Sequence, residues 1–180
     1  VNEGIGNPVS VAVEELYFTQ VDMIFDNELA KNKVYQLILT DTLFNCSGEY
    51  IAPGEVFDFV LPLDPEPFDI VINEIMPDPD PPVELPAYEY IELFNSTEDY
   101  LSMKGWMLEV GTTQKPVPDA IIPPNGYLIF ADSEVELLFG LFGQTIGFST
   151  LGLSNSGTTI KLRDAEDNLM SIVSYNPTWY

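Results

Sequence analysis

The chain has no histidine, a single cysteine and only 6 lysine and arginine residues among its 180 residues. Without histidine, neither a Ser/His/Asp triad nor a histidine-activated cysteine can form, and a zinc site lacks its usual ligands. The lone Cys46 excludes an intramolecular disulfide. No glycine-rich phosphate loop lies between a predicted strand and a helix. These absences argue against nucleophilic catalysis, zinc binding and nucleotide binding.

Long apolar runs are missing as well. The sequence contains no segment with the length and hydropathy of a transmembrane helix, and no signal peptide. The chain starts at Val1 rather than at methionine. We therefore expect any export signal to lie outside this chain, and we expect no direct membrane insertion.

Acidic residues outnumber basic ones by 29 to 6, which gives a formal net charge of −23. Nucleic acids and anionic membranes would be repelled, because binding to either begins with neutralising their negative charge. Two interpretations of the acidity remain: it keeps the protein soluble, or part of it binds a divalent cation such as Ca²⁺. The hydrophobic content of 46% is high enough for a folded core.

The segment 69–97 organises the fold prediction. Residues 69–75 are rich in β-branched side chains, and residues 88–94 alternate so that Ile91 and Leu93 share one face while Tyr90 lies on the other. The five prolines between these runs exclude a helix and remove backbone donors, which predicts a loop. We predict two core strands of a β-sandwich here.

Further short strands follow at the spacing of a β-sandwich, so the predicted fold class is all-β. A capping box formed by Ser133 and Glu136 predicts one short helix that ends at Gly140. Residues 1–63 offer four strands, too few for a closed sandwich, and we expect an incomplete second β-domain there. Residues 64–68 read as a proline-rich linker, and residues 69–180 as the sandwich. Strands are predicted at residues 9–13, 21–25, 34–40, 55–61, 101–110, 127–130, 158–163 and 169–175.

An ordered set of motifs runs through residues 69–180: Ile72-Asn73-Glu74-Ile75-Met76 with Pro77 and Pro79, Glu89-Tyr90-Ile91-Glu92-Leu93-Phe94-Asn95, Leu101 with Gly105-Trp106, Ile122-Pro123-Pro124 with Gly126, Leu153-Ser154-Asn155-Ser156-Gly157, Leu162-Arg163-Asp164, and Val173-Ser174-Tyr175 with Trp179. With these motifs, residues 69–180 resemble the lamin-tail domain in its bacterial form. The resemblance implies an immunoglobulin-like sandwich without catalytic activity. It also implies an accessory module of an exported or surface protein.

The N-terminal part contains four characteristic stretches: Gly4-Ile5-Gly6-Asn7-Pro8, residues 21–25, Tyr35-Gln36-Leu37-Ile38-Leu39 and Cys46-Ser47-Gly48. In these stretches it is similar to the last portion of bacterial immunoglobulin-like domains. The opening strands of such a domain are absent, which suggests a fragment of a longer protein. A truncated sheet has an open edge, and we expect that edge to allow self-association through the N-terminal β-region.

Two groups of residues are candidate binding sites. Asp78, Asp80 and Glu84 lie in the proline-rich loop and are candidate calcium ligands, although the loop lacks the glycine-bearing spacing of a dedicated calcium loop. Exposed tyrosines are candidates for a carbohydrate- or peptide-binding surface, with core packing as the simpler explanation. The tyrosines considered for this surface are Tyr88, Tyr90 and Tyr100.

Two weaker signals complete the set. Glu74 and Glu92 invite a paired-carboxylate hydrolase mechanism, against the simpler interpretation that the strand carboxylates pair with Lys104, Lys161 or Arg163. Asp41-Thr42-Leu43 fits a short O-glycosylation signal and equally fits a strand that ends in a turn.

The sequence therefore predicts a non-catalytic extracytoplasmic binding or spacer module of a larger exported bacterial protein. We expect an extracellular, cell-surface or periplasmic location and a protein, cell-surface or glycan partner. The alternative is a calcium-dependent or carbohydrate-binding adhesin module. No cofactor is expected, apart from Ca²⁺ in that alternative.

Overall fold

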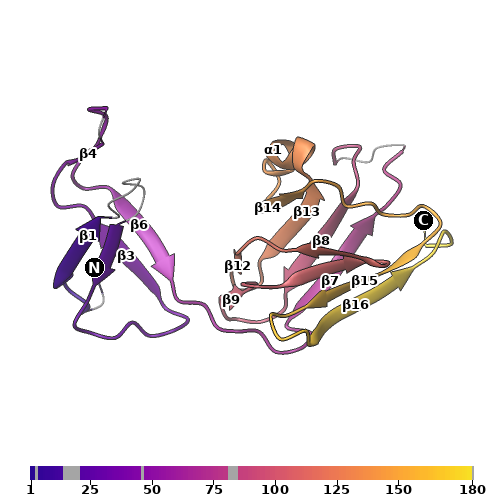
Figure 1. Ribbon diagram of the computed structural model, residues 1–180, viewed down its shortest axis with the longest axis horizontal. Helices are drawn as coiled ribbons and strands as arrows, with labels where there is room; N and C mark the ends of the chain where they lie inside the picture. Colours follow the sequence, from indigo (N-terminus) through magenta and orange to yellow (C-terminus); the bar gives the residue numbers. More distant parts are fainter. Residues whose placement is uncertain (3, 14–20, 46, 81–84, 180) are drawn as a thin grey trace. The chain divides into compact units, whose positions relative to one another are not determined.

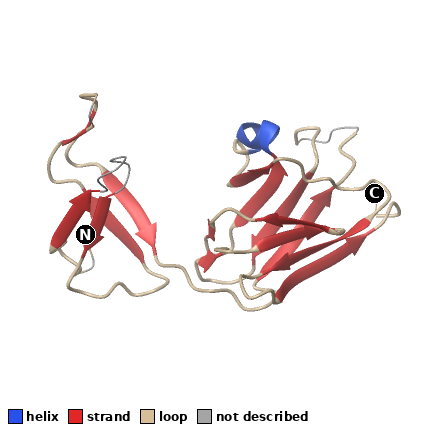
Figure 2. Cartoon of the chain, in the orientation of Figure 1, coloured by secondary structure: helices blue, strands red, loops and turns tan. Residues whose placement is uncertain are grey.

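Strands make up nearly all of the regular structure in the computed structural model, which describes residues 1–2, 4–13, 21–45, 47–80 and 85–179 (Figure 2). The chain divides into two units, Val1–Pro62 and Leu63–Tyr180, each with its own strands (Figure 1). In the described part of the chain, no helix is long and apolar enough to cross a membrane.

The first unit consists of three antiparallel strand pairs. Its buried apolar residues, within the described part, are Ile5 and Tyr35. The Tyr35 ring stacks on Phe59 at 5.5 Å between ring centroids, and its hydroxyl oxygen accepts a hydrogen bond from the backbone N–H of Ala30 at 2.8 Å. The pairs are β1 (Ser10–Val13) with β2 (Val21–Ile24), β3 (Val34–Ile38) with β6 (Val56–Val60), and β4 (Leu43–Phe44) with β5 (Tyr50–Ile51).

The four strands predicted for this unit correspond to β1, β2, β3 and β6, whereas the short β4–β5 hairpin was not predicted. Asn45 explains this hairpin, because its side-chain oxygen accepts hydrogen bonds from the backbone N–H groups of Ser47 and Glu49 across the turn. Whether the unit belongs to an immunoglobulin-like domain stays a prediction.

The second unit is a sandwich of two four-stranded sheets, which we call the β8 sheet and the β15 sheet. Most neighbouring strands are antiparallel, but β13 and β14 run parallel. In spatial order, the β8 sheet contains β14 (Thr145–Phe148), β13 (Tyr127–Asp132), β8 (Tyr90–Asn95) and β7 (Ile70–Met76), and the β15 sheet contains β11 (Thr113–Pro116), β10 (Met107–Val110), β15 (Thr158–Arg163) and β16 (Leu169–Tyr175). A small pair is formed by β9 (Leu101–Ser102) and β12 (Ile121–Ile122).

The main core lies between these two sheets. The β8 sheet contributes fully buried side chains such as Ile91, Leu93 and Phe130, and the β15 sheet contributes Ile160 and Leu162. The predicted inward alternation is confirmed at Ile91, Leu93, Ile160 and Leu162. Burial of this aliphatic and aromatic layer is the main stabilising term for the sandwich.

A second, smaller cluster covers the outer face of the β8 sheet. Tyr90, Ile129 and Ala131 point away from the main core and pack under Val135 and Phe139. These last two residues belong to η1 (Ser133–Val135) and α1 (Glu136–Phe139), which connect β13 to β14. The crossover therefore fills a sheet face that would otherwise be solvated.

The predicted capping box is wrong. Asp132, not Ser133, is the N-cap of η1, and it makes no capping hydrogen bond from its side chain. Its Oδ1 instead accepts a hydrogen bond from the backbone N–H of Leu151 at 2.5 Å. The carboxylate oxygen that could cap the helix is therefore used in a tertiary contact. The helix does end at Gly140, as predicted.

The predicted linker, residues 64–68, lies in the second unit. On its two sides, the Leu63 backbone exchanges hydrogen bonds with Tyr100 and Ser102, and the Phe68 N–H donates to the Met170 carbonyl at 2.9 Å. These contacts hold both ends of the proline-rich segment along the sandwich.

Candidate functional site

The three tyrosines predicted to share a ligand surface do not come together. Tyr90 is only 3% exposed, because it lies beneath Phe139 of α1, with 5.4 Å between ring centroids. Tyr88 is 48% exposed and precedes β8, whereas the half-buried Tyr100 follows its far end. The prediction of an exposed side chain is wrong for Tyr90. Tyr88 and Tyr100 lie beyond opposite ends of β8, whose six residues extend over about 20 Å.

The predicted calcium ligands are described only in part. Asp78 and Asp80 follow β7 and are exposed, while Glu84 lies outside the described residues. Among the residues that the structure describes, no group of three or more His, Cys, Asp or Glu side chains has the arrangement of a metal site. Calcium binding stays a prediction. The same is true of glycosylation at Thr42, and Cys46 lies outside the described residues.

Glu74 and Glu92 face each other on the outer side of the β8 sheet. The register pairs the two residues directly, and an irregularity between Ile72 and Glu74 introduces Asn73 beside them. The Asn73 amide donates to Glu92 Oε1 at 2.7 Å, and the Tyr90 hydroxyl donates to Glu74 Oε1 at 2.5 Å. Burial, followed by the hydrogen bond to Glu74, raises the pKa of Tyr90, which therefore stays a neutral donor.

This network does not have the form of a hydrolase site. A glycosidase pair flanks its substrate in a cleft, with one carboxylic acid of raised pKa. Glu74 is exposed on the face of a sheet, and each carboxylate is held by a neighbouring polar side chain. The arrangement instead offsets the repulsion between two directly opposed carboxylates.

Glu89 has a structural contact that sequence reasoning missed. Its Oε2 accepts a hydrogen bond from the backbone N–H of Leu153 at 3.0 Å, in the segment that Asp132 also holds through Leu151. Burial raises the pKa of Glu89, the Leu153 hydrogen bond acts against this shift, and the charge of Asp132 adds to it. No local pattern could have revealed this contact, because 64 residues separate its partners.

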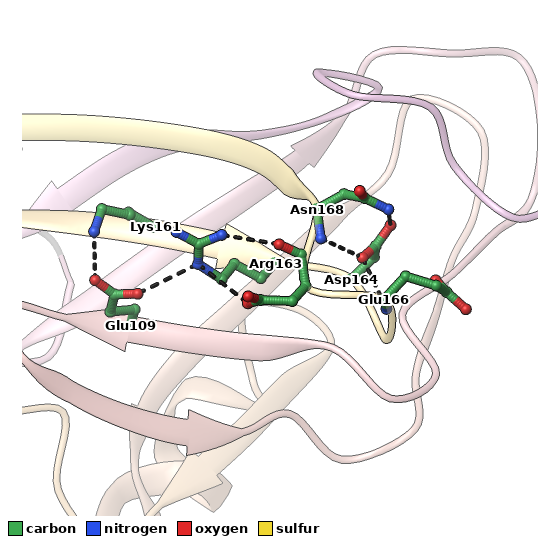
Figure 3. A network of polar contacts seen from close by, with 7 residues as sticks. Glu109, Lys161, Arg163, Asp164, Glu166 and Asn168 are labelled. Carbon is green, nitrogen blue, oxygen red and sulfur yellow. Dashed lines mark hydrogen bonds and ion pairs between the residues drawn. The ribbon is translucent and has the colours of Figure 1, made fainter.

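Lys161 and Arg163 pair with Glu109, and not with the carboxylates of the β8 sheet as predicted. Glu109 lies directly opposite Lys161 in the β10–β15 register, so the cross-strand neighbour decides the pairing. Figure 3 shows Lys161 Nζ at one carboxylate oxygen of Glu109 and Arg163 Nε near the other, at 3.4 Å. The hydrogen bond from Lys161 is the largest cause of the lowered pKa of Glu109.

The turn after β15 is held by Asp164. Its Oδ1 accepts hydrogen bonds from the backbone N–H groups of Glu166 and Asn168, at 3.0 and 2.8 Å, and its Oδ2 accepts one from the Asn168 amide (Figure 3). Arg163 Nη1 donates to the Asp167 carbonyl at 2.9 Å. These acids therefore build a hairpin rather than a ligand site.

A shallow groove runs along one side of the sandwich. Its volume is about 380 Å³, and it is lined by the second half of β7, by Val173 and Tyr175 of β16, and by Trp179. Its lining is mostly apolar, with Asn73 and Glu74 as polar groups. Both strands stand at the ends of their sheets, and the backbone N–H of Ile72 in β7 donates a hydrogen bond to Ser171 Oγ of β16 at 3.3 Å.

Comparison with known proteins agrees with this architecture. A search of the curated proteins found no match to the chain. The family model described as the Lamin Tail Domain matches residues 65–177, which include both four-stranded sheets. The expected immunoglobulin-like sandwich is thereby confirmed, and this fold is a non-enzymatic type of domain found in larger proteins. The chain belongs to the lamin tail domain family.

Proposed function

We propose that the chain is a non-catalytic binding or spacer module of a larger exported bacterial protein, and that it mediates protein–protein or surface attachment. The observation that carries this proposal is the use of its acids. Glu89 and Asp132 hold the backbone of one segment, while Glu109 holds two cross-strand bases. These carboxylates maintain a shape and do not converge on a substrate cavity.

Attachment is tested in the parent protein. Removal of residues 63–180 should leave any enzymatic activity of the parent within about twofold, because the module contributes no catalytic group, and should reduce its binding to partner surfaces. Both quantities are measured on the intact and the shortened protein. A loss of catalysis with attachment unchanged would refute the proposal.

The location is tested separately. An antibody raised against residues 63–180 should label unpermeabilised cells of the source organism or detect the protein in the medium or periplasm. A signal confined to the cytoplasmic fraction would contradict export while leaving the binding role open to its own test.

A calcium-dependent or carbohydrate-binding adhesin is the second candidate. Asp78, Asp80 and Tyr88 are exposed near the two ends of one loop, which supports it. Calorimetric titration should then show Ca²⁺ binding that Asp78→Asn/Asp80→Asn removes and Asp119→Asn keeps. Glycan-array binding should disappear with a chelator. Absence of heat at millimolar Ca²⁺ would exclude the calcium form.

Self-association through the N-terminal β-region is a further proposal. Apolar side chains of β1, β2 and β6 are exposed, among them Val11, Met23 and Phe57. Sedimentation velocity should show a dimer of the chain that Met23→Lys/Phe57→Lys converts to a monomer. A wild-type monomer at about 100 μM, well above typical dimer dissociation constants, would refute this association.

A further inference from the structure

The helix α1 and the turn after it hold four large apolar side chains in solvent. Single exposed apolar residues are common, but a contiguous group of them marks an interaction site. We call these four residues the α1 knob: Leu137, 90% exposed, Leu138, 41%, Leu141, 80%, and Phe142, 53%.

The α1 knob stands on a rigid base. Beneath it, Phe139 is fully buried against Tyr90, and Val135 packs in the same cluster. The backbone is closed by hydrogen bonds from the Gly140 N–H to the Glu136 carbonyl and from the Phe142 N–H to the Phe139 carbonyl, both 2.8 Å. Figure 1 shows α1 at one end of the sandwich, beside β13 and β14. A partner would therefore meet a preorganised shape, which lowers the entropic cost of binding.

Charge is separated between the two sheets. No lysine or arginine occurs between Lys33 and Lys104 or between Lys115 and Lys161, so the strands of the β8 sheet and α1 contain no base. In the β15 sheet, Lys115 lies in β11, and Lys161 and Arg163 lie in β15. The charged side chains in the strands of the β8 sheet and in α1 are therefore all acidic.

Acids flank the α1 knob on two sides. Glu134 and Glu136 lie in η1 and α1 themselves. The loop with the exposed Asp78 and Asp80 starts after β7, and residues at its two ends, Met76 and Leu85, pack on the same cluster as Phe139. An apolar projection with an acidic surround complements an apolar pocket with a basic rim.

We propose that the α1 knob inserts into an apolar pocket, rimmed by lysine or arginine, on a protein partner. This proposal rests on the proposed function and names the partner's chemistry. Buried leucine and phenylalanine side chains would supply most of the affinity, and the acids would set orientation and association rate. An anionic lipid surface would be repelled by the same acids, and so would the β8 sheet of a second copy.

The test uses the full chain and a labelled 14-residue amphipathic peptide of leucine and lysine as a model of a basic-rimmed apolar surface. Fluorescence anisotropy should show binding that Leu137→Ser/Leu141→Ser weakens at least about tenfold, because the two central apolar contacts are lost. The matched control, Leu169→Ser/Ile172→Ser, removes two exposed apolar residues of β16 and should stay within about twofold of wild type.

Further measurements decide between a basic-rimmed protein partner, a membrane and a second copy of the chain. Glu134→Lys should weaken peptide binding, added salt should weaken it further, and a leucine–glutamate peptide should not bind. Knob-dependent binding to phosphatidylcholine vesicles without peptide binding would overturn the proposal in favour of a membrane. A knob-dependent dimer that does not bind the peptide would overturn it in favour of a second copy. Equal peptide binding by wild type and Leu137→Ser/Leu141→Ser would also overturn it.

The experiments distinguish an error in the proposed docking through the α1 knob from an error in the proposed attachment function. Both leucines are mostly in solvent, so their substitution should leave the far-ultraviolet circular dichroism spectrum and thermal unfolding unchanged. If peptide binding does not depend on the α1 knob but deletion of residues 63–180 still reduces attachment, only the proposed docking surface is wrong.

Discussion

The two units of the chain consist of short strands with similar side chains but bury them to different extents. In the first unit, Phe44 and Tyr50 pair across a hairpin and are each 67% exposed. In the second, Phe130 and Phe148 pair at 5.1 Å inside a closed sandwich. The difference shows that alternation alone does not make a core: a second sheet must cover the apolar face.

The largest expected loss of stability comes from comparing the buried Phe130 of the second unit with the exposed Phe44 of the first. Phe130→Ala should lower the free energy of unfolding of the second unit by about 3–5 kcal/mol, because it leaves a cavity in the core. Denaturant titration followed by the buried Trp106 measures this loss. Phe44→Ala should leave hydrogen exchange in the β3–β6 pair unchanged. Faster exchange there would show that the first unit has a cooperative core after all.

The next effect compares two glycines with positive φ. Gly157 has φ +92°, and a Cβ there would overlap the Tyr175 carbonyl oxygen, whereas Gly54 has φ +94° and open space around it. Gly157→Ala should cost about 2–4 kcal/mol from overlap plus strain, and Gly54→Ala about 1–2 kcal/mol from strain alone. Thermal and denaturant unfolding measure the first, and hydrogen exchange the second. Equal losses would contradict the comparison.

A third comparison concerns two turn asparagines. Asn95 is fully buried; its amide donates to the carbonyls of Asp99, Ile122 and Pro123, at 2.8, 3.1 and 2.9 Å. Asn95→Ala should cost about 2–3 kcal/mol, since buried carbonyls lose their donor.

Asn45 is exposed on the first unit, and its side-chain oxygen accepts hydrogen bonds from the backbone N–H groups of Ser47 and Glu49. Asn45→Ala should change local stability by less than about 1 kcal/mol, because water replaces the lost contacts. Denaturant titration and hydrogen exchange give the two values. A large loss at Asn45 would mean that its hairpin is buried in solution.

The smallest effect concerns two carboxylates of the second unit with opposite pKa shifts. The pKa of Glu109 is lowered from 4.5 by Lys161, so its stabilising contribution is present above the unfolded pKa and is lost as pH falls through the folded pKa. The pKa of Glu89 is raised by burial, so its contribution is present at low pH and is lost as pH rises through the folded value.

Glu109→Gln should therefore destabilise at pH 7 by less than about 1 kcal/mol, with the difference vanishing in acid. Glu89→Gln should become more favourable relative to wild type as pH rises from 4 to 7. Unfolding titrations at several pH values measure both slopes. Parallel slopes for the two variants would show that the shifts are misassigned.

Sequence patterns predicted the strands that build the main core, because alternation at Ile91, Leu93, Ile160 and Leu162 reflects burial on one face. The ordered motifs also predicted the family. Strands β11 and β14 were not predicted. The segment Thr113–Pro116 has no apolar alternation, and it forms a strand by antiparallel pairing with β10. In β14, Gly147 is required because a side chain there would overlap Ser133 and Glu136.

The candidate site was predicted less well. Alternation correctly placed Tyr90 opposite the main core, yet that face is covered by a crossover helix, which no local pattern reveals. The ion-pair partner of Lys161 depended on the register of β10 with β15, and register is set by the whole sandwich. Leu137 and Leu138 were predicted only as part of a short helix, and Leu141 and Phe142 lie beyond its predicted end, because exposure is a tertiary property.

The parallel pairing of β13 with β14 has a further consequence. Parallel neighbours cannot be joined by a tight hairpin, so the chain between Asp132 and Thr145 must leave the sheet and return. Substitutions at its exposed positions, such as Leu137 and Leu141, would leave the core between the two sheets unchanged. Variants of this chain can therefore carry different side chains at the exposed positions of this connection above the same interior.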